Sequence, residues 1–367
     1  MDKLELVIEE QEQELKNNLD EVDRELEKYI ALQKARVRVF GAGGGGNNTI
    51  ARMREIGIKG CELVAVNTDA QDLLYTNADS KILIGKELTL GLGAGSDPKI
   101  GEDAARENEQ DIRKKMAGSN LVFVTCGLGG GTGTGSAPVI AEVAKKSGAL
   151  TIAIVTLPFT IEGQRRYQNA MQGIERLEKN VDTLIVIPND KLLELAPDLP
   201  LQTAFKVADE ILTNAVKGIT ELITKPGLVN LDFADVKAIM GKGGVAMIGV
   251  GESDGKDRSR DAVEKALNNP LLDVEIEGAT GGLVNIVGGK DMSLEEAKTV
   301  IDIVNEKMGD NANLIWGASV SEEMEKLLRV MVIMTGLKSP QILGPEEKKL
   351  EKDKLKIREE LGIEFFK

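Results

Sequence analysis

The sequence predicts an α/β protein with a parallel sheet covered by helices on both faces, a long central helix, and a smaller α+β domain towards the C-terminus. Two observations lead to this prediction. From Arg36 onward, short apolar runs with strand character alternate with helix-like segments, which is the pattern of a buried parallel sheet. The length of 367 residues is also sufficient for two domains with a large core.

Residues 1–35 are predicted to form a charged helical extension. Residues 1–30 contain eleven acidic and four basic residues, a net charge of −7. Apolar side chains recur at helical spacing and share one stripe. They are Leu15, Leu19, Val22, Leu26 and Tyr29. Because heptads are not sustained, an extension that is docked on the body or partly solvated fits better than a coiled coil.

Residues 36–201 are predicted to form the first domain. Its strands are short apolar runs, and helices and glycine-rich loops alternate with them. Strands are expected at 37–40, 63–66, 121–124, 151–156 and 183–187. Helices are expected at 49–55, 102–116 and 137–147, with glycine-rich loops at 41–48 and 127–135.

One helix over residues 202–224 is predicted to connect this domain to a second one at residues 225–340. Apolar residues of this helix lie on one stripe, namely Phe205, Ala208, Ile211, Leu212, Ala215, Ile219 and Leu222. In the second domain, strands are expected at 245–250, 283–287, 313–316 and 328–334, and helices at 258–268 and 293–308. Residues 341–367 are predicted to be a charged tail.

The composition excludes several classes of protein. A net charge of −14 and 3% aromatic residues argue against a nucleic-acid partner. The chain has no histidine, which rules out Ser-His-Asp and Cys-His catalysis and histidine zinc sites. The isolated Cys61 and Cys126 fit a reducing cytoplasm. No signal peptide is expected, and no apolar run approaches the ~20 residues of a membrane span.

The glycine segment 127–135 is the strongest functional signal. It has six glycines and two threonines between an apolar strand and a predicted helix. Glycines let consecutive backbone N–H groups close on an anion, and the helix N-terminus behind them adds a favourable dipole. The segment therefore favours phosphate binding over a purely structural loop.

The glycine segment 41–48 permits a competing interpretation. Gly41, Gly43 and Gly46 satisfy GxGxxG, and Asp69 lies about where a ribose-binding acid would fall. Taken alone, this favours a dinucleotide-binding oxidoreductase, but the second glycine segment has no role in that fold and the hydride-transfer residues are missing. A P-loop also fails, because no Gly-Lys pair is followed by Ser or Thr. Two glycine loops at strand ends can instead surround one polyphosphate from two sides.

Two further polar groups have both functional and structural interpretations. Asn67-Thr68-Asp69 ends a predicted strand and could reach a sugar or a magnesium-bound water, or it could be a plain turn. Asp232 and Asp235 follow the long helix, three residues apart, and are expected to point the same way. They would orient a water towards a γ-phosphate or act as helix caps. The residues alone leave both alternatives open.

Together these segments resemble the FtsZ family, the prokaryotic relatives of tubulin. The resemblance covers nearly all of residues 36–337, and its motifs occur in the family's order. They include 41–48, 67–71, 91–95, the tubulin-type signature at 129–135, 158–159, 162–163, 187–192, 226–228 and 230–236. The short charged tail is more similar to archaeal members than to bacterial ones.

The resemblance implies a tubulin-like fold and a GTPase that assembles head to tail into protofilaments of the cell-division ring in the cytoplasm. GTP and GDP are the implied ligands, with Mg²⁺ bound through phosphates and water. The implied partners are the chain itself and a membrane-anchor or regulatory protein at the C-terminal tail, without nucleic acid and without a direct membrane span.

The resemblance also assigns roles to single residues. Nucleotide contacts in the loops are expected from Gly44, Gly45, Gly46, Asn47, Asn48, Asn67, Gly130, Gly131, Thr132, Gly133 and Thr134. Contacts to the ribose and the base are expected from Glu162, Arg166, Asn189, Phe205 and Asp209. Asn230, Asp232 and Asp235 match an acidic loop that completes the pocket of the neighbouring subunit. Such a heterologous contact makes an open filament.

Two other functions are weighed against this one. The first is a cytoskeletal paralogue that binds GTP as a structural ligand and hydrolyses it poorly, which the intact Asp232 and Asp235 disfavour. The second is the dinucleotide-dependent oxidoreductase, which the missing catalytic residues disfavour.

Overall fold

The computed structural model describes residues 35–191, 200–224, 227–229, 232–268, 278–308 and 312–337, without the side chains of residues 201, 202 and 204. The extension predicted over residues 1–35, apart from residue 35, and the tail predicted over residues 341–367 lie outside these ranges. Asn230, one of the predicted site residues, also lies outside them.

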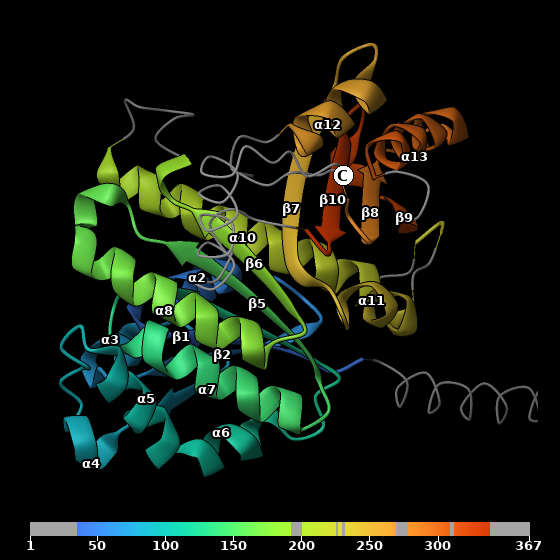
Figure 1. Cartoon of the computed structure of the whole chain (residues 1–367). Helices are drawn as coiled ribbons and strands as arrows, with labels where there is room; N and C mark the ends of the chain where they lie inside the picture. Colours follow the sequence, from blue (N-terminus) through green and yellow to red (C-terminus); the bar gives the residue numbers. More distant parts are fainter. Residues whose placement is uncertain are drawn as a thin grey trace, which may run out of the picture. The chain divides into compact units, whose positions relative to one another are not determined.

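A ten-stranded sheet organises the described residues (Figure 1). Its order is β3-β2-β1-β4-β5-β6-β7-β10-β8-β9. Neighbouring strands are parallel, except that β10 is antiparallel to β7 and β8. The strands are β1 (Val37–Ala42), β2 (Cys61–Asn67), β3 (Ser80–Leu83), β4 (Leu121–Gly127), β5 (Leu150–Leu157), β6 (Thr183–Pro188), β7 (Gly244–Ser253), β8 (Gly281–Gly288), β9 (Asn313–Val320) and β10 (Leu328–Thr335). The predicted α/β class is confirmed, and so is the strand expected at 328–334.

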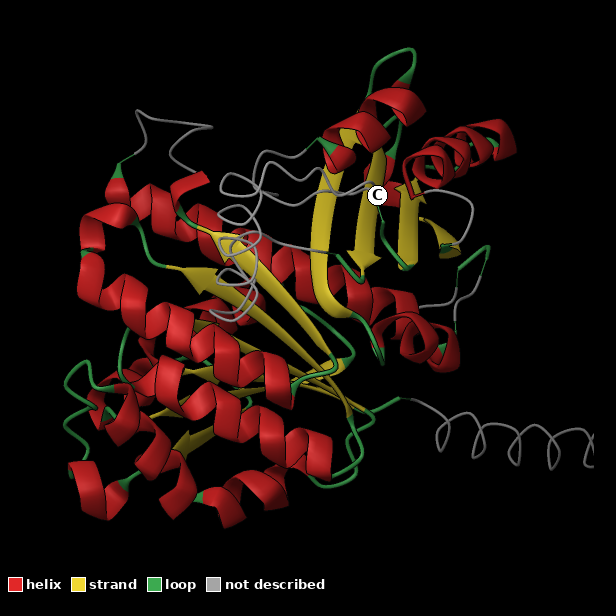
Figure 2. Cartoon of the chain, viewed as in Figure 1, coloured by secondary structure: helices red, strands yellow, loops and turns green. Residues whose placement is uncertain are grey.

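Helices connect these strands and lie on both sides of the sheet (Figure 2). Before β7 they are α2 (Gly43–Ile56), α3 (Ala70–Tyr75), α4 (Lys86–Thr89), α5 (Pro98–Glu107), α6 (Glu109–Met116), α7 (Thr132–Lys146), α8 (Gln164–Asn180), α10 (Leu201–Thr224) and α11 (Phe233–Met240). After β7 they are α12 (Arg258–Leu267) and α13 (Leu294–Met308). Short 3₁₀ turns occur at η1 (Thr160–Glu162) and η2 (Glu322–Met324).

The central strands are apolar without alternation because both of their faces are buried. Along β1, Val39 lies in a core with Ile50 of α2 and Ile219 of α10. The next residue, Phe40, lies in a second core with Ile140 of α7. Successive side chains of a strand point to opposite faces, so one strand supplies both cores. This confirms the prediction that helices cover both faces.

The two predicted glycine loops are wrong in extent, because helices begin inside them. α2 starts at Gly43 and α7 at Thr132. Glycine is a poor helix former, so the sequence favoured loops there. Close packing overrides that preference. A Cβ on Gly46 would lie 2.6 Å from the carbonyl oxygen of Thr125, and a Cβ on Gly135 would lie 2.0 Å from that of Pro98.

The single helix predicted over 102–116 is also wrong, since α5 and α6 are separate and meet at Asn108. Asn108 has a non-helical backbone (φ −104°, ψ 23°), and its Oδ1 accepts the N–H of Gly85 at 2.8 Å, a tertiary contact that holds the break between the two helices. The sequence analysis did not predict α3, α4, α8 or β3; helix caps at Asp232 and Asp235 were one of its alternatives, and α11 begins there. The sequence of α8 does carry a helical signal, because its buried Ala170, Ile174 and Leu177 recur at helical spacing.

The last four strands extend the same sheet. Thr183 of β6 pairs with Gly244 of β7 in parallel register. Helices α12 and α13 pack on these strands in a third core that includes Val263, Val300 and Val332. In the described ranges, no helix is both long and apolar enough to cross a bilayer.

Candidate functional site

A cavity of about 400 Å³ lies at the carboxyl ends of β1, β4, β5 and β6. This edge of a parallel sheet is where α/β proteins bind ligands. The lining residues come from the starts of α2 and α7, from the loops after β5 and β6, and from α10. They are residues 42–45, Asn48, Thr49, Gly127, Leu128, residues 130–133, Thr156, Pro158, Glu162, Arg166, Asn189, Phe205, Ala208, Asp209 and Leu212.

Two helix N-termini meet at one end of the cavity. The first turn of α2 contributes Gly43 to Gly45, and the start of α7 contributes Gly131 to Gly133. Neither helix has a side-chain cap or an acidic residue in its first turn. The first N–H groups of a helix have no partner within the helix, and its N-terminus carries a partial positive charge. Two such ends at one cavity form a site for an anion.

Glycine is required where these helix ends approach each other. Gly43 has φ of +68°, and a Cβ there would lie 2.7 Å from the backbone nitrogen of Gly133. Gly130, in contrast, faces open space, because no heavy atom lies within 4 Å of the position that its Cβ would occupy. The glycines thus serve two purposes. Some allow the two helices to pack together, and Gly130 leaves open space at the cavity.

A carboxylate of α10 also lines the cavity. The Asp209 Oδ1 accepts a hydrogen bond from the hydroxyl of Thr49 at 2.8 Å. Burial raises the pKa of Asp209 to about 6, although the Thr49 hydroxyl and the charge of Arg52 act in the opposite direction. A half-buried acid of this kind suits a ligand that donates hydrogen bonds.

Aromatic and amide groups line the same cavity. The ring of Phe205 is 40% exposed and meets the buried ring of Phe159 edge-on, with centroids 5.2 Å apart. The Asn189 Oδ1 is buried and has no hydrogen-bond partner in the part of the chain that the structure describes. Glu162 forms an ion pair with Arg166 and accepts the N–H of Phe159 at 2.9 Å. An exposed ring face and an unpaired acceptor fit a flat, hydrogen-bonding base.

Four predicted contact residues do not line the cavity. Gly46 packs against β4, and Thr134 accepts the N–H of Gly129 at 2.9 Å, which shapes the second glycine segment. Asn47 and Asn67 both donate to the carboxylate of Asp72. The structure brings together the other twelve predicted contacts, which are Gly44, Gly45, Asn48, Gly130, Gly131, Thr132, Gly133, Glu162, Arg166, Asn189, Phe205 and Asp209.

The acidic pair at the start of α11 lies elsewhere in the chain. The Asp235 N–H donates to the Asp232 carboxylate at 2.8 Å, and the Asp232 N–H donates to the Asp235 carboxylate at 3.1 Å. This reciprocal arrangement is a capping box. From Asp209 to the end of α10 at Thr224 the helix extends about 22 Å. The pair does not line the cavity of its own chain.

Several lining residues were missed by the sequence analysis. Thr49 contacts Asp209, and Thr156 and Pro158 lie at the end of β5. Thr49 had a usable signal, since it lies one helical turn beyond the glycines of α2. Pro158 lies in the 158–159 motif of the resemblance, although no contact was assigned to it, and Thr156 had no signal stronger than its position at a strand end.

The fold and the cavity define the class, an α/β protein with an anion-binding cavity at the carboxyl edge of a parallel sheet. Residues 36–197 match the GTPase domain of the tubulin/FtsZ family, and residues 244–338 match the C-terminal domain of the FtsZ family. Cell division protein FtsZ 1 of Pyrococcus furiosus is 61% identical over 330 residues, which cover 90% of this chain and 88% of that protein. The chain therefore belongs to the FtsZ family.

Solved structures agree with this assignment. An empty FtsZ dimer of M. jannaschii is 58% identical and superposes with a TM-score of 0.82, covering 86% of this chain and 92% of that chain. The GDP-bound monomer of CetZ1 from Haloferax volcanii shares the fold, with a TM-score of 0.75 at 23% identity, covering 87% and 99% of the two chains. The predicted resemblance, including its archaeal character, is confirmed. Nothing in these comparisons supports the oxidoreductase alternative.

Proposed function

We propose that the cavity binds GTP, with the triphosphate at the two helix N-termini and guanine beside Asp209. One observation carries this proposal: the same cavity is lined by two uncapped helix starts and by the half-buried carboxylate of Asp209. Guanine offers the N1–H and the 2-amino group as donors to a carboxylate, and adenine does not. Family membership in a GTPase class supports the same ligand.

Within this proposal the remaining lining residues have separate roles. The exposed ring of Phe205 stacks on the base, and the unpaired Asn189 oxygen accepts a hydrogen bond from the nucleoside. Glu162 and Arg166 contact the ribose and the adjoining phosphate. Gly46, Asn47, Asn67 and Thr134 act indirectly, by holding the glycine segments in place.

Mg²⁺ fits this site as a partner of the substrate. The described residues contain no cluster of three or more acidic or cysteine side chains able to hold a metal ion. Mg²⁺ commonly keeps several waters and binds through substrate phosphates. It would therefore be held mainly by phosphate oxygens and water, and it would neutralise charge on the triphosphate.

Hydrolysis of GTP to GDP and phosphate is proposed to require two copies of the chain. Asp232 and Asp235 would polarise the attacking water beside the γ-phosphate held by the next subunit. Supporting this, α10 extends about 22 Å from Asp209 to its C-terminal end, and the acidic pair follows that end in the chain without lining the cavity. A solved M. jannaschii relative is described as a dimer. A contact between unlike surfaces repeats into an open filament.

The cellular role follows from the same proposal. The filament would form the cell-division ring in the cytoplasm, and a membrane-anchor or regulatory protein would contact the C-terminal tail. The relatives are named as cell division proteins, which supports this role.

The test is the GTPase rate per subunit as a function of protein concentration. If two chains form each active site, the rate per subunit should rise steeply above a threshold concentration, where light scattering also reports polymer. A rate that is constant down to dilute monomer would overturn the shared site. GTP binding without measurable turnover at any concentration would favour the paralogue that uses GTP as a structural ligand.

A further inference from the structure

Asp72 in α3 connects α2, whose first turn lines the cavity, with the end of β2. Its Oδ2 accepts the Nδ2–H of Asn67 at 2.6 Å and the Nδ2–H of Asn47 at 3.1 Å. Asn47 lies in α2, just beyond the glycines of its first turn, and Asn67 ends β2. Asp72 itself does not line the cavity. Among the residues that the structure describes, it is the acceptor that both amides share.

The carboxylate determines which way both amides face. An ionised carboxylate only accepts hydrogen bonds, so each asparagine must turn its NH₂ group towards Asp72. The Asn67 Oδ1 then faces the backbone, where it accepts the N–H of Thr68 at 2.8 Å and the N–H of Asp69 at 3.2 Å. These bonds fix the loop after β2. Reversing the Asn67 amide would leave two backbone donors without this acceptor.

The same loop reaches the second glycine segment. The hydroxyl of Thr68 lies 2.6 Å from the hydroxyl of Thr132, the first residue of α7. Thr132 lines the cavity, and Thr68 is fully buried. A chain of side-chain hydrogen bonds thus runs from α2 through Asp72 and the loop after β2 to the start of α7. Because its members are largely removed from water, the loss of one link affects the others.

Asp72 also lies beside the first turn of α2. Its Oδ2 would be 3.9 Å from a Cβ on Gly44, a residue that lines the cavity. Asn47 is 1% exposed, and its Oδ1 has no hydrogen-bond partner among the residues that the structure describes. The orientation of Asn47 therefore depends on Asp72, since no competing bond holds its other end.

We propose that Asp72 is a positioning residue that sets the two helix N-termini relative to each other, and with them the affinity for the phosphates of a guanine nucleotide. This inference rests on the proposed function, because it needs a nucleotide in the cavity. It assigns to Asp72 an effect on GDP and GTP affinity through Asn47 and Asn67, without any contact to the nucleotide.

The experiment measures the dissociation constant for GDP in the full chain at a protein concentration below assembly. Asp72→Ala removes both acceptor bonds and should weaken GDP binding at least tenfold. Asp72→Asn can still accept both amide N–H groups at its single Oδ1, so it should stay within about threefold of wild type. Asp79→Ala is the matched control. It removes an acceptor of two bonds, from Leu63 N at 2.9 Å and Arg54 at 2.5 Å, at a site outside the cavity lining.

The outcomes separate this inference from the proposed function. If wild type fails to bind GDP, the nucleotide assignment is wrong and the role of Asp72 is lost with it. If wild type binds and Asp72→Ala binds equally well, only the positioning role is overturned, even when the unfolding midpoint falls. Equal weakening in Asp72→Ala and Asp72→Asn would also overturn it. Should Asp72→Ala not fold, Asn47→Ala tests the same link and should weaken GDP binding at least threefold.

Discussion

At the scale of single residues, ionised Asp209 lowers the stability of the nucleotide-free protein, and the same carboxylate is proposed to bind guanine. Its pKa is raised to about 6 by burial, so the folded, nucleotide-free protein holds a proton on this group more strongly than the unfolded chain does. Ionisation of Asp209 therefore destabilises the free protein. A guanine that donates two hydrogen bonds to the carboxylate would offset that cost. Such a trade between stability and function is common at binding sites.

Nucleotide affinity and stability should consequently respond to pH in opposite directions. As pH rises from about 4 to about 6, the stability contributed by protonated Asp209 is lost, by roughly 3 kcal/mol from a pKa of 3.8 unfolded and about 6 folded. Over the same window GDP should bind more tightly, because the carboxylate becomes available. Denaturant unfolding without nucleotide and GDP titration between pH 4 and 8, both in the full chain, measure the two effects.

Asp209→Asn provides the control for both effects. It should flatten the stability change between pH 4 and 6 and increase stability at pH 7, since no charge is buried. It should bind GTP weakly and gain affinity for XTP, because the Asn NH₂ can donate to the 2-oxo group of xanthine. Unchanged GTP affinity in this variant would contradict guanine recognition by Asp209.

A second prediction at the residue scale concerns Gly130. A Cβ at this position meets no atom within 4 Å, so Gly130→Val should change the free energy of unfolding by no more than about 0.5 kcal/mol. Its side chain would occupy space at the anion-binding end, and GTP affinity should fall at least tenfold. Gly131→Val is the comparison, because a Cβ there would lie 2.8 Å from the backbone nitrogen of Asp97 and should reduce stability as well. Full GTP affinity in folded Gly130→Val would argue against a phosphate at this end.

At the scale of elements, Asp232 and Asp235 at the start of α11 have two roles. They cap the helix, and they are proposed to act in catalysis. Asp232 and Asp235 form a capping box, and losing a cap costs about 0.5–2 kcal/mol. Loss of activity in an alanine variant would therefore not distinguish catalysis from a frayed helix. Asp235→Asn keeps an oxygen that can accept the Asp232 N–H but cannot polarise water as a carboxylate does.

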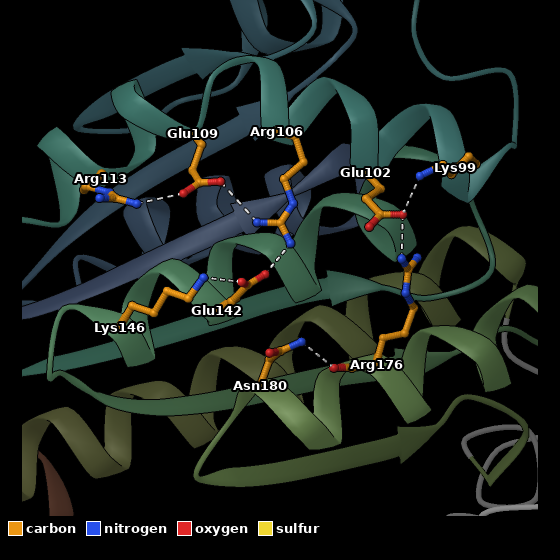
Figure 3. A network of polar contacts seen from close by, with 9 residues as sticks. All are labelled: Lys99, Glu102, Arg106, Glu109, Arg113, Glu142, Lys146, Arg176 and Asn180. Atoms are coloured by element: carbon orange, nitrogen blue, oxygen red, sulfur yellow. Dashed lines mark hydrogen bonds and ion pairs between the residues drawn. The ribbon is translucent and has the colours of Figure 1, made fainter.

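The helices that support the second glycine segment are connected by ion pairs (Figure 3). Glu102 of α5 bonds to Arg176 of α8 at 2.5 Å and to Lys99 at 3.3 Å. In a second group, Arg106 of α5 contacts both Glu109 of α6 and Glu142 of α7. The Arg176 guanidinium, with smaller effects from Lys99, holds the pKa of Glu102 below its usual value. These pairs hold α5 against α7 and α8.

Removing the Glu102 charge should reduce stability in a pH-dependent way. Glu102→Gln should lower the free energy of unfolding by about 1 kcal/mol at pH 7 and low salt. A carboxylate with a lowered folded pKa contributes stability above its unfolded pKa of about 4.5, and the contribution is lost as pH falls through the folded pKa. The difference from wild type should therefore vanish in acid and shrink in high salt. Glu322→Gln, in the exposed Lys290–Glu322 pair, is the control and should change stability by less than about 0.3 kcal/mol.

At the scale of the whole molecule, α10 determines how the proposed catalytic parts are distributed. Phe205 and Asp209 near its start line the cavity, and the acidic pair follows its C-terminal end. The helix extends about 22 Å beyond Asp209, and the acidic pair does not line the cavity of its own chain. Complementation between two inactive variants is therefore the sharpest test of a shared site.

Mixing Asp235→Asn with Gly130→Val should restore part of the GTPase activity. Each variant alone should turn over little GTP, the first for lack of a carboxylate and the second for lack of nucleotide. In a filament assembled at random from equal amounts of the two variants, roughly a quarter of the contacts would pair an intact cavity with an intact acidic pair. The GTPase activity of the mixture should therefore recover to roughly a quarter of the wild-type value. Phosphate release by each variant and by the mixture measures it. No recovery in mixtures shown to copolymerise would mean that the site is not shared.

The sequence by itself determined the class of fold, the family and most of the cavity lining. Strands that are buried on both faces are continuous apolar runs, which can be recognised in a sequence. Glycine segments at the ends of such strands indicate where the backbone can approach an anion. It also placed most strands and the long helix to within a few residues. The fold class and the glycine segments depend on local composition and on the order of segments along the chain, whereas Glu162, Arg166, Asn189, Phe205 and Asp209 were expected only from the resemblance to the FtsZ family.

Only the tertiary structure decided where helices begin inside the glycine segments and what the polar residues around the cavity contact. α2 and α7 start at Gly43 and Thr132 because they pack closely on neighbouring elements, which local propensity opposes. The positioning role proposed for Asp72 rests on its hydrogen bonds to Asn47 and Asn67, which lie 25 and 5 residues away in the chain. Thr49 and Asp209 meet across 160 residues. Hydrogen bonds over such separations depend on how elements pack, and a single sequence carries no local signal for them.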